Sequence, residues 1–153
     1  VPVANFSAAA MIAFAGLASA GECPANKVKE GAVTSGKTEP VGVTDTVIAS
    51  IDLEPKGGDF TDHLLHMRKL TIAPGDVVPW HKHSQRPANI YILSGTIEEY
   101  RANCEVPIVH KVGEVAVEFG KGFAHWWKNT GSEPVELISA DIFRAATKDA
   151  HMM

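Results

Sequence analysis

The stretch Gly75-Asp76-Val77-Val78-Pro79-Trp80-His81-Lys82-His83 lies in the middle of this 153-residue chain and has the pattern of a turn followed by a β-strand. Alternate residues of a strand point to the same face, so His81 and His83 present two imidazoles side by side. A third imidazole, His125, follows later in the chain. Three histidines delivered by neighbouring strands form three corners of a transition-metal site, whereas ordinary strand histidines are the alternative.

Short strand-like runs punctuated by Gly and Pro surround this stretch. No segment before residue 144 has a convincing helical period, and turn residues separate the runs at regular spacing. This pattern predicts an all-β domain, either a closed barrel or a double sheet. The expected strands cover residues 47–51, 64–72, 77–83, 90–93, 96–101, 106–110, 116–119, 125–128 and 135–143, and a turn is expected at 73–76.

Length and composition fit one globular domain. With 153 residues and 45% hydrophobic residues, the chain can build one core but not two. The formal net charge is -4 and the basic residues are scattered. A nucleic-acid partner is therefore not expected, since such a surface needs a clustered basic patch.

The N-terminal segment differs from the remainder of the chain. Residues 8–17 are apolar and uncharged, and Ala18-Ser19-Ala20 is a small-x-small sequence suited to signal peptidase. We expect a signal peptide at 1–20, cleaved after Ala20, with a periplasmic or secreted product; a buried N-terminal helix is the alternative. The apolar run is shorter than the ~20 residues of a spanning helix, so no membrane association is expected after cleavage.

The expected organisation after the signal has three parts. These are an extended arm at 21–45, a barrel domain at 46–145 and a polar tail at 146–153. Cys23 lies just after the cleavage point, and Cys104 lies between two strand-like runs. In an oxidising compartment the two cysteines could form a disulfide that ties the arm to the barrel, and two free thiols are the alternative.

The three histidines and the glycines around them resemble the two motifs of the cupin superfamily. The segments Gly75-x5-His81-x-His83 and Gly122-x2-His125-x3-Asn129, with Gly95 between them, carry the resemblance. The chain is most similar to small, exported, single-domain bacterial cupins of the Cupin_2 type. This resemblance implies a jelly-roll β-barrel that holds a divalent transition metal (Fe, Mn, Ni, Zn or Cu) in its mouth.

One departure from the cupin motif concerns the metal ligands. The position of the motif glutamate falls on Ala88, or on Pro87 at the alternative spacing, and neither residue can bind a metal. We therefore expect a three-histidine site without a carboxylate. Gln85, or less directly Asn89, is the candidate for a substitute fourth ligand. Cupins with three-histidine sites include ferrous dioxygenases that act on thiols or diketones.

Two further residues are candidates for catalysis. His66 and Arg68 share one face of an expected strand with Leu70 and Ile72. If that face lies inside the barrel, Arg68 could hold a substrate carboxylate and His66 could relay a proton. In the alternative, both side chains lie in solvent near the strand end. Arg86 is a second candidate for anion binding.

Three functions are compatible with the sequence. The first is a metal-dependent dioxygenase acting on a small, anionic organic substrate. The second is a metal-dependent isomerase, lyase or hydrolase. The third is a non-catalytic protein that binds a small ligand or a metal, since fold alone does not define function. A homodimer is a further expectation.

Overall fold

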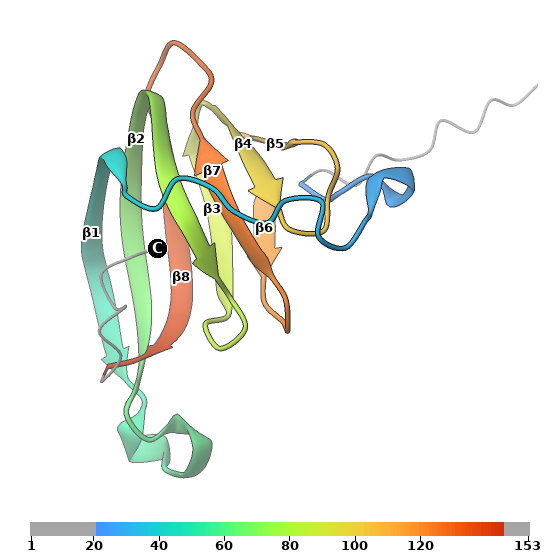
Figure 1. Ribbon diagram of the computed structural model, residues 1–153. Helices are drawn as coiled ribbons and strands as arrows, with labels where there is room; N and C mark the ends of the chain where they lie inside the picture. The colour runs from blue at the N-terminus through green and yellow to red at the C-terminus, as the bar shows by residue number, and fades with distance from the viewer. Residues whose placement is uncertain (1–20, 146–153) are drawn as a thin grey trace, which may run out of the picture.

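Eight antiparallel strands form one sheet that curls into a nearly closed barrel, seen in the computed structural model (Figure 1). The structure describes residues 21–145, so the signal peptide expected at 1–20 and the tail at 146–153 lie outside the described residues. Along the sheet the order is β5-β4-β7-β2-β8-β3-β6, with β1 added on β2. The strands are β1 (Val41–Asp52), β2 (His63–Lys82), β3 (Ala88–Ser94), β4 (Thr96–Arg101), β5 (Ile108–Lys111), β6 (Val115–Glu118), β7 (Ala124–Lys128) and β8 (Val135–Arg144).

Strand β2 connects the two halves of the barrel. Its first half pairs with β8 over residues 63–72, and its second half pairs with β7 over residues 77–82. The turn expected at 73–76 is instead a bulge inside one 20-residue strand. Gly75 lies there with a φ of 83°, a backbone conformation that glycine adopts without steric cost. After the bulge the second half of β2 pairs with β7, which places His81 opposite His125, and His83 follows the end of the strand.

The core consists of the inward-facing residues of the strands, which alternate with outward-facing residues along each strand. In β8 every second residue is buried from Val135 to Phe143, which is the period of two that a half-buried strand requires. One buried apolar cluster contains Ala88 and Ala116 together with the larger side chains of Leu70, Ile72, Val78, Ile90, Ile92, Ile97, Trp127, Val135 and Leu137. The predicted all-β jelly-roll barrel is confirmed.

The segment before β1 lies against the barrel and is tied to it covalently. The disulfide between Cys23 and Cys104 is present. Backbone hydrogen bonds link Lys29 to the loop after β4, and Trp80 in β2 donates its N–H to the carbonyl of Lys37. In Figure 1 this segment runs from the blue end near β4 and β5 to β1. Three short 3-10 helices complete the described chain: η1 (Ala25–Lys27), η2 (Glu54–Lys56) and η3 (Gly58–Phe60).

Strand β1 starts at Val41, earlier than the expected strand at 47–51, and is exposed along nearly its whole length. Among the strands that the structure describes, it pairs with β2 only. The homodimer remains a prediction. Between residues 21 and 145, no helix has the length and apolar character needed to cross a membrane.

Candidate metal centre

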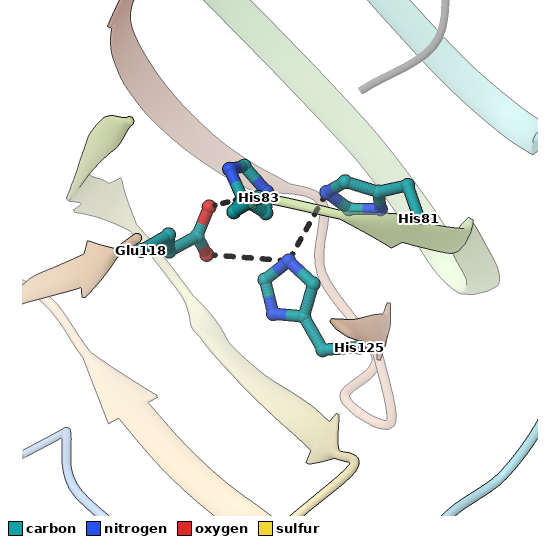
Figure 2. A group of neighbouring side chains, drawn as sticks. All are labelled: His81, His83, Glu118 and His125. Atoms are coloured by element: carbon teal, nitrogen blue, oxygen red, sulfur yellow. Dashed lines mark hydrogen bonds and ion pairs between the residues drawn. The ribbon is translucent and has the colours of Figure 1, made fainter. Parts of the chain in front are cut away.

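The three predicted histidines converge inside the barrel, and a glutamate joins them (Figure 2). β2 provides His81, the residue that follows its end provides His83, β7 provides His125, and β6 provides Glu118. His81 and His125 are direct partners in the β2–β7 pairing. One ligand atom from each of the four residues lies within 4.8 Å of all the others. The four side chains could therefore surround a single ion.

Backbone carbonyls orient His81 and His83. Nδ1 of His81 lies 2.7 Å from the carbonyl oxygen of Pro79, and Nδ1 of His83 lies 2.7 Å from that of Arg86. A carbonyl oxygen can only accept a hydrogen bond, so each Nδ1 carries the proton and donates it. Each Nε2 then keeps its lone pair and is the free ligand atom. This is the usual way in which proteins orient histidines that bind metals.

A carboxylate orients the third histidine. Nδ1 of His125 lies 2.6 Å from Oε1 of Glu99, a fully buried residue of β4. Nε2 of His125 therefore points toward the other ligands and lies 3.0 Å from Nε2 of His81. Two lone-pair nitrogens at this distance repel each other unless a proton or a cation lies between them.

The centre of the cluster contains acceptors without donors. Nε2 of His83 and Oε1 of Glu118 are buried and make no hydrogen bond within the described chain. Oε2 of Glu118 lies 3.0 Å from Nε2 of His83, and Oε1 lies 3.6 Å from Nε2 of His125. Buried polar atoms without a partner are rare and need an explanation. A divalent transition ion would satisfy them, because three imidazole nitrogens and one carboxylate are ligands that such ions bind.

Burial sets the protonation state that such an ion needs. It lowers the pKa of His81 well below its usual value and, aided by the nearby His125, lowers that of His83 to about 3. Burial also lowers the pKa of His125, although the hydrogen bond to Glu99 opposes this effect. All three imidazoles are therefore neutral at pH 7, as metal ligation requires. Burial and the charge of Glu99 raise the pKa of Glu118, an effect that a bound cation would reverse.

The expectation of a site without a carboxylate is wrong. Glu118 in β6 is the direct cross-strand partner of Ala88 in β3, the position where the motif would place its glutamate. Directly paired residues point to the same face of a sheet, so the carboxylate enters the cluster from the neighbouring strand. Gln85 is exposed and lies outside the cluster, and Asn89 is also exposed.

Glu118 was missed because its strand has a misleading pattern. Ala116 and Glu118 are buried, whereas Val115 and Val117 are 46% and 57% exposed. The usual rule places the two valines inside and the glutamate in solvent. The motif itself contained a signal. Because its glutamate is replaced by Ala88, a carboxylate could have been sought in the strands that can pair with Ala88.

Arg68 and His66 are both buried, in contrast to the solvent alternative. Arg68 donates hydrogen bonds to Asp141 at 3.1 Å, to Asp45 at 2.6 Å and to Ser139 at 3.4 Å. Arg86 contacts the second oxygen of Asp141 at 2.6 Å. We call these five residues (Asp45, Arg68, Arg86, Ser139 and Asp141) the Asp141 cluster. The expected role of Arg68 in holding a substrate remains a prediction.

His66 lies beside the Asp141 cluster. It is the cross-strand partner of Asp141, and its ring packs on the edge of Phe143 with 4.3 Å between ring centroids. Its Nδ1 is buried and makes no hydrogen bond to any described residue. Burial lowers the pKa of His66, so its ring is neutral at pH 7. Its role as a proton relay remains a prediction.

Comparisons with known proteins agree with this fold. Residues 68–141 match the Cupin_2 family, a cupin domain. Germin-like protein subfamily 2 member 2 of Arabidopsis thaliana is 34% identical over 77 residues, which are 48% of this chain and 35% of that protein. Germin-like protein 5-1 of Oryza sativa subsp. japonica is 32% identical over 77 residues, covering 48% and 34% of the two chains. The matched segment thus spans about a third of these relatives.

Two solved structures are similar in fold. A predicted oxalate decarboxylase from Thermotoga maritima superposes with a TM-score of 0.53 and 19% identity, over 76% of this chain and 98% of that one. An oxalate oxidase in complex with the substrate analogue glycolate gives a TM-score of 0.50 and 20% identity, over 73% and 60% of the two chains. The family match identifies residues 68–141 as a cupin domain, and the barrel and its His/Glu cluster support a metal-binding member of the cupin superfamily.

Proposed function

We propose that this chain is a metal-dependent enzyme acting on a small organic acid, with His81, His83, Glu118 and His125 as ligands of one divalent ion. The observation that carries the proposal is the convergence of four ligand atoms within 4.8 Å, from three buried residues and the half-buried His81; two of these residues have a buried polar atom that makes no hydrogen bond to a described residue. Three neutral imidazoles and one carboxylate would leave a divalent ion with a net charge of about +1. Such a centre favours an anionic ligand.

A dioxygenase is the reaction class that we propose first. Three imidazoles and one carboxylate suit iron and manganese as well as zinc. A bound ion of this kind would supply Lewis acidity, and iron or manganese would add redox chemistry. The chain's own contribution is to keep the imidazoles neutral and oriented in a buried site. The structures of similar fold include an oxalate oxidase with glycolate, which favours small carboxylates as the substrate class.

A lyase or isomerase is the second candidate, and His66 is the observation that favours it. A neutral, buried imidazole whose Nδ1 makes no hydrogen bond can transfer a proton to or from a substrate. Arg68 is less suited to substrate binding, because anchoring a carboxylate would have to displace Asp45 or Asp141. A similar structure described as a predicted oxalate decarboxylase agrees with this class.

We also propose that the protein acts in an oxidising compartment, either periplasmic or extracellular. The disulfide between Cys23 and Cys104 supports this location, because such bonds persist mainly outside the cytosol. A signal peptide at 1–20 would explain the export. The homodimer is proposed as well, and sedimentation of the mature protein tests it.

Metal analysis and oxygen uptake test the proposed function. Protein purified without added chelator should contain about one equivalent of a transition metal, and the double variant His81→Ala/His125→Ala should contain none. The iron-loaded or manganese-loaded protein is then assayed with a panel of small carboxylates, with and without oxygen. Oxygen consumption supports a dioxygenase, whereas turnover without oxygen supports a lyase. Loaded protein that turns over no carboxylate in either atmosphere would exclude both.

Glu118 and Gln85 give a matched pair of variants for the ligand set. Glu118→Gln should lose most of the metal, because a neutral amide is a weaker ligand than a carboxylate. Gln85→Ala should retain all of it, because Gln85 is exposed and outside the cluster. The opposite pattern would show that the fourth ligand has been assigned to the wrong residue.

A further inference from the structure

A buried network of charged residues lies behind His125, on the side away from the proposed metal. Its centre is Glu99, which is fully buried in β4. One oxygen of Glu99 lies 2.6 Å from Nδ1 of His125 and 2.8 Å from Nε of Arg101. The other lies 2.9 Å from Nε2 of His110 and 2.8 Å from Nη2 of Arg101. Glu99 therefore accepts four hydrogen bonds and fixes the place of three side chains.

The contact with Glu99 determines which ring nitrogen of His125 carries the proton. Nε1 of Trp127 also lies 3.0 Å from Nδ1 of His125, and an indole N–H can only donate. If Nδ1 accepted that hydrogen bond, its lone pair would face a carboxylate oxygen at 2.6 Å. The same carboxylate accepts two hydrogen bonds from the guanidinium of Arg101 at 2.8 Å, as an ionised carboxylate does. The geometry thus favours a proton on Nδ1 and a free Nε2.

The network continues to the segment before β1. Nη1 of Arg101 lies 3.0 Å from Oε2 of Glu22. Glu22 is adjacent to Cys23, which forms a disulfide with Cys104. Cys104 lies directly after the short turn at residues 102–103 that follows Arg101. The disulfide therefore keeps Glu22 beside Arg101. The guanidinium makes hydrogen bonds to Glu99 on one side and to Glu22 on the other, so both carboxylates restrict its position.

We propose that Glu99 is a positioning residue for His125, and that the disulfide-anchored Glu22 supports it through Arg101. This inference rests on the proposed role of His125 as a metal ligand. According to this proposal, the segment before β1 also supports metal binding, and removal of its contact with Arg101 should weaken the affinity for the metal. Partners of this kind typically change metal affinity by about 10- to 100-fold when removed.

The first measurement uses the metal-free protein. Ring ¹⁵N chemical shifts at pH 7 report which nitrogen of His125 is protonated. In the wild type Nδ1 should be protonated, and in Glu99→Gln the two tautomers should mix. Because this variant leaves the charge of Arg101 buried, Glu99→Gln/Arg101→Met serves as a second variant that removes both charges. An unchanged tautomer in whichever variant folds would overturn the proposal, whether or not the protein binds metal.

The second measurement is the affinity for zinc. Glu99→Gln should bind zinc about 10- to 100-fold more weakly than the wild type, and Glu22→Gln should show a smaller loss. Glu105→Gln is the matched control, because Glu105 also pairs at 3.0 Å with a residue of the same segment, Lys29, but does not touch Arg101. Wild-type affinity in Glu99→Gln would refute the positioning role, and equal losses in Glu22→Gln and Glu105→Gln would refute the role of Glu22. A wild type that binds no metal would instead refute the proposed function.

The third measurement tests whether the disulfide acts through Glu22. Cys23→Ser/Cys104→Ser should weaken zinc binding to the extent that Glu22→Gln does. Adding Glu22→Gln in this background should cause little further loss, because the two changes remove one coupled interaction. Fully additive losses would show that Glu22 and the disulfide act independently and would overturn this part of the proposal.

Discussion

The metal centre and the Asp141 cluster are two buried polar clusters in one barrel, and they differ in the balance of donors and acceptors. In the Asp141 cluster two arginines face two aspartates, with contacts of 2.6 to 3.1 Å. In the metal centre three imidazole nitrogens and one carboxyl group converge on one another, and the two atoms Nε2 of His83 and Oε1 of Glu118 make no hydrogen bond to a described residue. Balanced charges satisfy each other, whereas converging acceptors need a cation from outside.

The two clusters are neighbours in the sheet. Ala88 in β3 pairs with Glu118 of β6 on one side and with Asp141 of β8 on the other. The three residues therefore lie in one row across the inward face, with the small Ala88 between the two carboxylates. Adjacent positions in one row thus serve different purposes, and burial of a charged residue alone does not identify a ligand site. Four predictions test this comparison.

The largest effect is expected from Asp141→Asn. This change leaves Arg68 and Arg86 buried without their shared carboxylate, and breaking a buried ion pair from one side typically costs about 3–5 kcal/mol. Urea denaturation of the metal-free protein measures the change in the free energy of unfolding. Glu136→Gln is the control, because its pair with Lys69 is exposed and should contribute less than about 1 kcal/mol. Similar small losses in both variants would show that the Asp141 cluster is not structural.

The second prediction concerns stabilisation by zinc. At a free zinc concentration about 100 times the Kd, binding to the folded state alone adds about 2.7 kcal/mol to the free energy of unfolding. Calorimetry should show this increment in the wild type but not in His83→Gln at the same concentration. Asp141→Asn, although less stable, should keep the increment. Its loss in Asp141→Asn would mean that the two clusters are not independent.

The third prediction concerns acid. The pKa of His83 is about 3 in the folded protein, below the 6.5 of an ordinary histidine. Between these values the unfolded chain binds the proton and the folded chain does not, so stability falls as the pH falls. With chelator present, His83→Gln should reduce this slope by up to about 1.4 kcal/mol per pH unit. An unchanged slope in urea titrations would show that His83 is protonated in the folded state.

The smallest effect is expected for Glu118→Gln in the metal-free protein, and it has the opposite sign. Burial raises the pKa of Glu118 above 4.5, so above that pH the folded state binds a proton that the unfolded state has lost. Stability therefore falls as the pH rises through this range. The neutral amide should remove that loss, so the variant should gain stability relative to the wild type as the pH rises. A variant that loses stability instead would place Glu118 among satisfied residues such as Asp141.

Local patterns were sufficient to predict the strand residues and the three histidines. His81 lies at the end of β2 and His83 directly follows it, so the two-residue period of the strand still brings both side chains to one site. Six expected strands, among them 96–101 and 135–143, match observed ones within about two residues. The turn expected at 73–76 was wrong, because pairing with β1 and β7 continues β2 through the bulge.

The carboxylates could not be predicted in the same way. Glu99 and Glu118 are both buried glutamates in short strands, where the usual preference places charged residues in solvent. Their burial is explained by partners from other strands. Glu99 has His110, His125 and Arg101, and Glu118 lies among the three histidine ligands.

The amino-acid sequence was enough to predict an all-β chain, the three histidines and the cysteines that could pair, because strand periodicity and motif spacing are properties of neighbouring residues. The three-dimensional arrangement was needed to find that Glu118 of β6 lies among the histidines and that Glu99 contacts His125. These facts depend on which strands lie side by side and in what register, and distant parts of the chain set that register together.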